Sequence, residues 1–347
     1  MPSSTSSSEA RPRGRRVPAA FLLGVLLFAA TDHLLWSNRD LLRFVGRYMP
    51  PGPNGDPLLS TLGVLELPRT GPPPVLLLGS SQVREGLDCA PFERRLPGRP
   101  CRNLGISAGS PLDVLYLSRQ IDRRAPRHVA VLGLFPKVLH GRLKEPFVDG
   151  STVGCLLSRG NWRRLSGSDR MEVAFGLLQG LSPTLRFKDG LWDFYGVVRP
   201  DLGAAWSFRL PPQPKRLLAQ QPPQPPEYFA LRLNKVDPEG VRPSLAGAHE
   251  EALERLLAHE RQRGNRVIVI DFPTRPGYES TLLPETLENH RRIMAGLARR
   301  SDLSLVSAPD LPALTTGDFL DFTHLSRTGR SKVSDRLAEI VARLEGS

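Results

Sequence analysis

Five short strand-like runs divide the chain and predict a sheet. Most are rich in Val, Leu or Ile and end at a turn-forming residue, which is typical of strands buried on both faces. The runs lie at 75–79, 101–105, 128–135, 266–272 and 303–308.

Amphipathic helices are predicted between these runs, because apolar residues recur there at spacings of three and four. The stretch 110–125 begins at a serine cap, Ser110, followed by a proline. Similar patterns occupy 246–264, 283–300 and the last helix, which carries Val333, Leu337, Ile340 and Leu344. Alternating strands and helices predict an α/β fold with a parallel sheet covered by helices on both faces.

The N-terminal end is predicted to anchor the chain in a membrane. Residues 1–16 form a polar, basic tail, and residues 17–36 form an apolar run of about 30 Å at helical rise. Asp32 and His33 lie near its outer end, where we expect head groups and water to solvate them, and Trp36 suits an interface.

The orientation of this segment follows from its charges. Arginines precede the apolar run at positions 11, 13, 15 and 16, so the positive-inside rule places the tail in the cytoplasm and the rest outside. A cleaved signal peptide is the alternative. Cleavage after Ala29 or Ala30 would put Leu27 or Phe28 three residues before the cut, where a small residue is needed. We therefore expect an uncleaved single-pass anchor; in both cases the bulk of the chain reaches the periplasm or cell surface.

The remaining chain is predicted to have two further parts. Residues 37–70 read as a stalk with one helix, and the proline clusters at 49–57 and 68–74 are typical of linkers. Residues 71–345 read as the α/β domain. The stretch from about 140 to 245 breaks the alternation with aromatic residues, Gly-rich turns and a second proline cluster, so we expect an inserted helical cap there.

Composition narrows the classes of partner. Hydrophobic residues make up 40% of the chain, which is enough for a core, and the net charge of +12 favours anionic partners. Export, the lack of zinc-ligand spacing and the lack of an aromatic-basic stripe argue against nucleic acid. The sequence implies no metal and no organic cofactor.

The three cysteines leave two alternatives open. Cys89, Cys101 and Cys155 form no C-x-x-C pair. Outside the cytosol, a Cys89–Cys101 disulfide can form and leave Cys155 as a thiol. The alternative is three buried thiols.

Candidate chemistry lies where the predicted strands end, because parallel sheets place their sites at the carboxyl edge. Gly79-Ser80-Ser81 follows the first strand, and Asp271 ends the fourth. Ser81 is either a residue of an ordinary exit loop or a nucleophile, and a nucleophile needs a base.

Of the seven histidines, His324 is the favoured base. Asp321 lies three residues earlier, close enough on a turn to fix the imidazole tautomer; the alternative is a pair of ordinary loop residues. His140, in a loop after a strand end, and Asp271 stay open as an alternative base and acid. The other histidines are weaker candidates for the base. His33 lies in the anchor, and His128 lies at the opposite end of the sheet. We expect His249, His259 and His290 on solvated helix faces.

Together these features resemble the SGNH/GDSL hydrolase family, over about half of the chain (72–140 and 245–345). Gly79-Ser80-Ser81-Gln82 takes the place of the family's Gly-Asp-Ser-Leu, which implies that Ser81 is the nucleophile. The stretch 103–108 stands where the family has Asn-x-Gly-x-x-Gly, so the resemblance implies an oxyanion hole that uses the amide of Ala108 or Gly109. Asp321 and His324 match the family's last block. The resemblance also implies a three-layer α/β/α, flavodoxin-like fold.

Two departures from the family pattern narrow the resemblance. Ser80 replaces an aspartate, and the third block, 133–136, lacks the asparagine that donates to the oxyanion. Losing such a donor costs about 10²–10³ in rate where a mechanism depends on it. These departures, on an exported anchored domain, resemble the subgroup with the D-alanyl-transfer protein of teichoic-acid modification and the acetyltransfer proteins of exopolysaccharide export.

The resemblance implies a membrane-anchored serine esterase or O-acyltransferase that acts on acyl esters of cell-surface polymers. Ser81, His324 and Asp321 would form its triad, and a protein of the envelope machinery would be a partner. The alternative is a catalytically degenerate, SGNH-like polysaccharide-binding or scaffold subunit. The acyl group, the acceptor and the choice between hydrolysis and transfer stay open.

Overall fold

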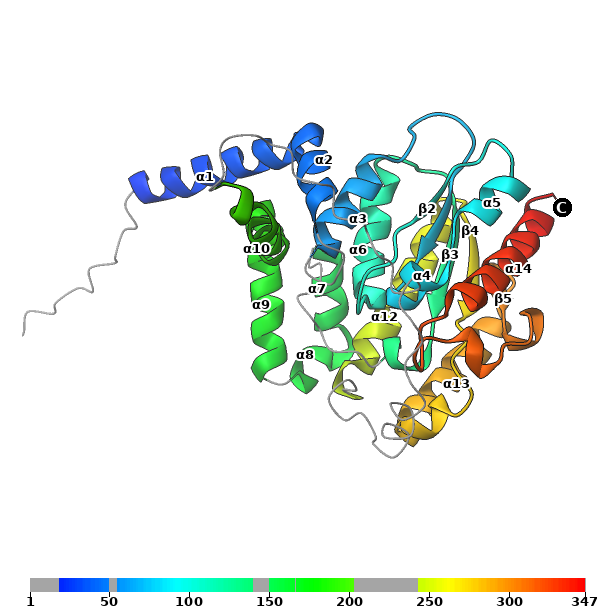
Figure 1. Cartoon of the computed structure of the whole chain (residues 1–347). Helices are drawn as coiled ribbons and strands as arrows, with labels where there is room; N and C mark the ends of the chain where they lie inside the picture. The colour runs from blue at the N-terminus through cyan, green and yellow to red at the C-terminus, as the bar shows by residue number, and fades with distance from the viewer. Residues whose placement is uncertain (1–18, 50–54, 140–149, 166, 203–242, 347) are drawn as a thin grey trace, which may run out of the picture.

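The computed structural model describes residues 19–49, 55–139, 150–165, 167–202 and 243–346. Five strands form one all-parallel sheet in the order β2-β1-β3-β4-β5 (Figure 1). They are β1 (Val75–Leu78), β2 (Cys101–Asn103), β3 (Val129–Leu134), β4 (Arg266–Asp271) and β5 (Ser304–Val306). Each lies inside a run predicted to be a strand, and this strand order is that of flavodoxin-like doubly wound sheets.

Helices cover both faces of the sheet, which makes three layers. On one face α6 (Pro111–Asp122) packs against α12 (Pro243–Gln262); on the other, α4 (Ser81–Gly86) and α5 (Ala90–Arg95) pack against α14 (Arg327–Gly346) (Figure 1). Helix α13 (Pro284–Ala298) follows β4. Every residue of β1 and β3 is buried, as expected for central strands of a covered parallel sheet.

The segment predicted as a stalk with one helix contains two. These are α2 (Arg39–Tyr48), capped by the Asn38 side chain, and α3 (Asp56–Leu65). Val64 and Leu67 belong to the same buried core as the sheet. This segment is therefore packed onto the α/β domain, because its apolar residues gain more from burial than from exposure on a free connector.

The predicted insertion is helical wherever the structure describes it. It contains α7 (Gly150–Leu157), α8 (Asn161–Arg164), α9 (Gly167–Leu181) and α10 (Pro183–Leu202). Helices α7 and α8 contact α12, whereas α10 contacts α1 (Ala19–Ser37), α2 and α3. The predicted base His140 lies outside the described residues.

Among the described residues, no helix has both the length and the apolar character needed to cross a membrane. At the outer end of the predicted anchor, His33 is exposed as expected, but Asp32 is not. Asp32 is 5% exposed, and it accepts hydrogen bonds from Ser182 and Thr184 at the start of α10. Trp36 is buried too and donates to the Thr184 hydroxyl at 2.7 Å. A helix N-terminus takes the place of water as the partner of this carboxylate.

Of the two alternatives for the cysteines, the structure contains the disulfide. Cys89 and Cys101 are bonded with their Cα atoms 5.3 Å apart, which ties the start of α5 to the start of β2. Cys155 is buried in the core and takes no part in the disulfide.

We expect the Cys89→Ser/Cys101→Ser double variant to lose about 2–3 kcal/mol of unfolding free energy, because the bond closes a short loop in the unfolded chain. Urea denaturation followed by circular dichroism measures this loss. Cys155→Ser, which removes a buried thiol but no cross-link, is the control. A double variant as stable as the parent protein under oxidising conditions would contradict the prediction.

Candidate active site

Ser81 lies at the carboxyl edge of the sheet because the chain turns sharply between β1 and α4. Gly79 makes this turn with φ +147°, and a Cβ there would lie 2.6 Å from Val83 Cγ2 and 2.9 Å from the Gly133 carbonyl oxygen. Only glycine tolerates both the dihedral angle and the close approach. Ser81 is consequently the first residue of α4, at the helix N-terminus.

His324 comes from the loop that precedes α14, and Asp321 shapes that loop. The Asp321 Oδ1 atom accepts the backbone N–H groups of Thr323 and His324, both at 2.8 Å. The Leu320 N–H donates to the His324 carbonyl at 2.8 Å and closes the turn. These bonds explain why the two side chains need a spacing of three residues.

The structure brings Ser81, His324 and Asp321 together. The His324 Nδ1 atom lies 2.8 Å from Asp321 Oδ2, and His324 Nε2 lies 3.0 Å from Ser81 Oγ. An ionised carboxylate only accepts hydrogen bonds, so Nδ1 carries the proton and Nε2 presents its lone pair to the serine hydroxyl. This is the geometry of a nucleophile, a base and an orienting group.

Asp321 is held in its ionised form. Burial opposes ionisation, but the hydrogen bond and charge of His324 and the two backbone N–H groups outweigh it, so the pKa of Asp321 lies below its ordinary value. The negative charge is therefore in place to stabilise an imidazolium on His324.

The loop 103–109 contacts the turn before Ser81, because the Ile106 N–H donates to the Gly79 carbonyl at 2.9 Å, and it has one N–H group without an acceptor in the described chain. Of the two amides predicted for the oxyanion hole, Gly109 N–H donates to the Ile106 carbonyl at 2.9 Å. Within the described chain the N–H groups of Ala108 and Ser81 donate to no acceptor. Ala108 is also the one described non-glycine residue with positive φ, at 54°. Such a conformation costs about 1–2 kcal/mol and is often found at functional sites.

The residues that depart from the family pattern have other partners. Ser80, where the family has aspartate, is buried and donates to the side-chain oxygen of Gln82. The Gln82 oxygen also lies 3.4 Å from Ser81 Oγ, farther than His324 does. Phe135 and Pro136, at the place of the missing asparagine, are buried and have no side-chain donor. An oxyanion here would therefore rely on backbone amides.

Sequence reasoning missed a buried carboxylate beneath this loop. Asp56, at the start of α3, is 4% exposed, forms an ion pair with Arg84 of α4 and accepts the Ser107 N–H at 2.5 Å. Burial raises the pKa of Asp56, although Arg84 and Ser107 counteract it. The Asn103 side chain adds hydrogen bonds to the carbonyls of Val83 and Leu87, at 2.9 and 3.0 Å. Asp56 and Asn103 thus join the helix that carries Ser81 to the loop that carries Ala108.

The prediction that three histidines lie on solvated helix faces was wrong for His249 and His290, which are buried. Their helices are rich in charge, but these positions face inward. His259 is 20% exposed, with Nε2 2.8 Å from Asp122 Oδ2. His128 precedes β3 and pairs with Glu260 at 3.0 Å, at the amino edge as expected.

The alternative acid, Asp271, has a different partner. Its Oδ1 atom lies 2.9 Å from His290 Nε2, and His290 comes from α13 rather than from the loop of His324. The one direct carboxylate contact of His324 in the described chain is with Asp321.

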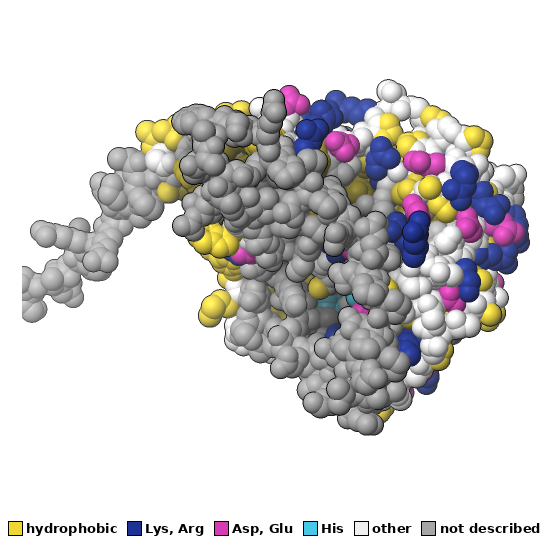
Figure 2. Space-filling model, in the orientation of Figure 1, with side chains coloured by type: hydrophobic (Ala, Val, Ile, Leu, Met, Phe, Trp, Pro, Cys, Tyr) yellow, Lys and Arg dark blue, Asp and Glu magenta, His cyan; other side chains and the backbone are white. Residues whose placement is uncertain are grey.

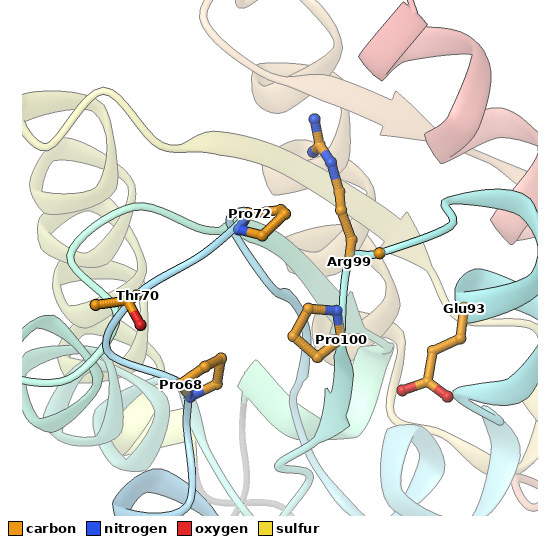
Figure 3. A pocket seen from close by; sticks show the side chains of 7 residues that line it. Pro68, Thr70, Pro72, Glu93, Arg99 and Pro100 are labelled. Atoms are coloured by element: carbon orange, nitrogen blue, oxygen red, sulfur yellow. The ribbon is translucent and has the colours of Figure 1, made fainter.

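The described residues contain no group of three or more His, Cys, Asp or Glu side chains placed to hold a metal ion. An open hollow of about 460 Å³ lies at the amino ends of β1 and β2, lined by Pro72, Arg99, Pro100 and neighbours (Figure 3). It is at the edge of the sheet opposite Ser81.

Comparisons with known proteins do not assign the chain to a family. No model of a protein family matches it, and no curated protein matches it either. The family resemblance therefore rests on the motifs themselves.

Replacing Asp56 with Asn should loosen the loop that carries Ala108. The amide still accepts one hydrogen bond but removes one of the two carboxylates paired with Arg84, which leaves Glu85, and bonds to charged groups contribute about 1.5–3 kcal/mol each. We expect amide hydrogen exchange in residues 104–110 to accelerate by about 10- to 100-fold.

Ser60→Ala is the matched control, because Ser60 is buried in the same helix and bonds only to carbonyls of α3. Equal exchange rates in both variants would show that Asp56 does not hold the loop.

Proposed function

We propose that this protein is an exported, membrane-anchored serine esterase or O-acyltransferase that acts on acyl esters of cell-surface polymers. The observation that carries the proposal is the pair of distances at His324, 3.0 Å to Ser81 Oγ and 2.8 Å to Asp321 Oδ2. Ordinary loop residues capping a turn have no reason to meet a serine 243 positions away.

In the first half of the reaction the acyl group moves to Ser81. Ser81 Oγ attacks the ester carbonyl carbon while His324 Nε2 takes the hydroxyl proton. The carbonyl oxygen becomes an oxyanion, which the N–H groups of Ser81 and Ala108 stabilise. The bond to the leaving alcohol then breaks, and the alcohol oxygen receives the proton from His324.

In the second half the acyl group leaves Ser81. A water molecule or a sugar hydroxyl attacks the acyl-serine carbonyl, and His324 takes the proton of the attacking oxygen. Collapse of the second oxyanion returns that proton to Ser81 Oγ and frees the acid or the new ester. Hydrolysis and transfer therefore use the same residues and differ in which acceptor enters.

The proposed location rests on the N-terminal sequence and on the disulfide. Residues 17–36 would be the single-pass anchor, with the basic tail in the cytoplasm and the α/β domain in the periplasm or at the cell surface. A Cys89–Cys101 bond is typical of proteins outside the reducing cytosol. The net charge of +12 suits an anionic polymer as substrate.

The first test is labelling of the purified full-length protein with a fluorophosphonate, which reacts with an activated serine. We expect stoichiometric labelling that is lost in Ser81→Ala and reduced by about 10³-fold or more in His324→Ala. Ser80→Ala, which changes the neighbouring serine, is the control and should keep most of the labelling.

A folded protein that takes no label would overturn the proposal. It would favour the degenerate polysaccharide-binding subunit, a reading to which the missing asparagine donor also points.

The two candidate carboxylates are separated by matched substitutions. Asp321→Asn should lower turnover of a p-nitrophenyl ester by about 10⁴-fold, since an amide favours the wrong histidine tautomer. Asp271→Asn should change turnover by less than about tenfold, because its partner is His290. The reverse ranking would show that Asp271 is the catalytic acid.

A further inference from the structure

In the described chain, the large hydrophobic side chains that are exposed are concentrated in the N-terminal and inserted helices. Every large hydrophobic residue that the described chain exposes belongs to α1, α2, α7, α9 or α10, and none to the strands or helices that flank the sheet. These residues are Leu23, Val25, Leu26, Leu27, Phe28, Leu34, Leu35, Phe44, Leu157, Met171, Leu177, Leu178, Leu185 and Trp192. Figure 2 shows apolar side chains along the projecting α1. Apolar surface of this extent marks a protein or membrane contact.

Helices α9 and α10, which we call the helical pair, are joined to α1 where its apolar run ends. Only Ser182 separates the two helices, and Ser182 and Thr184 both donate to the Asp32 carboxylate. Trp36 packs edge-on against Phe187 with ring centroids 5.1 Å apart. Asp32 and Trp36 thus hold the helical pair against the C-terminal part of α1, where the projecting part of this helix begins.

The part of α1 before Asp32 has no protein cover on much of its surface. Leu26, Leu27 and Phe28 are 66%, 59% and 60% exposed, and this end points away from the α/β domain (Figure 1). If this segment lies in lipid, the helical pair lies at the depth where α1 leaves the hydrocarbon.

The helical pair exposes apolar side chains and a tryptophan, which are typical of helices at the membrane interface. Met171 and Leu178 are seven residues apart on α9, as are Leu185 and Trp192 on α10, so each couple shares one helix face. Met171 and Trp192 are 73% and 74% exposed, and tryptophan favours the membrane interface.

Basic residues lie next to these apolar faces. Arg163 and Arg164 in α8 and Arg170 in α9 are exposed, at the end of the helical pair that follows α8. Guanidinium groups at this level can bind anionic lipid head groups. Apolar faces flanked by arginines are the pattern of helices that lie in a membrane surface.

We infer that the helical pair is a second membrane contact, and that it lies in the head-group region of the bilayer that holds α1. The inference rests on the anchor in the proposed function and is independent of catalysis at Ser81. The occupant of the apolar surface is lipid because α10 packs against α1, whose exposed apolar side chains lie in lipid in the proposed function. With α1 in the hydrocarbon and the helical pair in the head-group region, the α/β domain would be held at a fixed distance from the membrane and in a fixed orientation.

The test uses the full-length chain in vesicles of phosphatidylcholine and phosphatidylglycerol. A thiol-reactive NBD fluorophore is attached to a cysteine introduced by Leu27→Cys, Trp192→Cys or Ala295→Cys, each at an exposed position. The native disulfide and buried Cys155 leave the introduced thiol as the accessible one. Two sets of vesicles carry a nitroxide lipid labelled either near the head group or deep in the acyl chain, and each label quenches fluorophores at its own depth.

We expect position 27 to be quenched by the acyl-chain nitroxide and position 192 by the head-group nitroxide. Position 295, on α13 and away from α1 in Figure 1, should be quenched by neither. Quenching at 27 without quenching at 192 overturns the second membrane contact and leaves the anchor intact. No quenching at 27 refutes the anchor and the inference together. A blue-shifted but unquenched fluorophore at 192 means that protein, such as a second copy of this chain, covers the helical pair, and this also overturns the inference. Fluorophosphonate labelling of the same samples reports separately on the proposed activity.

Discussion

Burial of the central strands on both faces is the constraint that orders the rest of this structure. β1 and β3 expose no residue, so their backbone groups pair within the sheet and their side chains are apolar. Polar chemistry is thereby confined to the strand ends. Because the strands are parallel, the turn after β1, the loop after β2 and the loop before α14 can all reach the same edge. The sharp turn at Gly79 then places Ser81 at a helix N-terminus, where backbone N–H groups face any developing negative charge.

The candidate oxyanion hole depends on the backbone rather than on side chains. With Phe135 and Pro136 at the end of β3, no asparagine contributes a donor there. The left-handed conformation of Ala108 leaves its N–H without an internal acceptor, whereas the N–H groups of Ser107 and Gly109 are both satisfied. A site built in this way needs a rigid loop, since backbone amides cannot turn independently of the chain. Asp56 and Asn103 supply that rigidity by joining the loop to α4.

The N-terminal helices connect this site to the proposed membrane contact. Helix α3 provides Asp56 beneath the loop of Ala108, and α10, which contacts α3, also contacts α1 through Asp32 and Trp36. A continuous series of packed helices therefore runs from the exposed apolar segment of α1 to the loop of Ala108. The segment that the sequence presents as a stalk is the structural link between the two.

The sequence by itself determined the features that depend on local pattern. Most of the five strands follow from apolar runs bounded by turns, and the spacing of Asp321 and His324 follows from a turn in which the aspartate accepts backbone N–H groups. Only the tertiary structure decided which distant groups meet. The contact between Ser81 and His324, the partner of Asp271 and the burial of His249 and His290 depend on how helices pack across the sheet, and charge-rich helix sequences do not reveal which residues face inward. The role of Asp56 and the choice between the Ala108 and Gly109 amides could not be predicted for the same reason: each depends on a backbone path fixed by contacts from elsewhere in the chain.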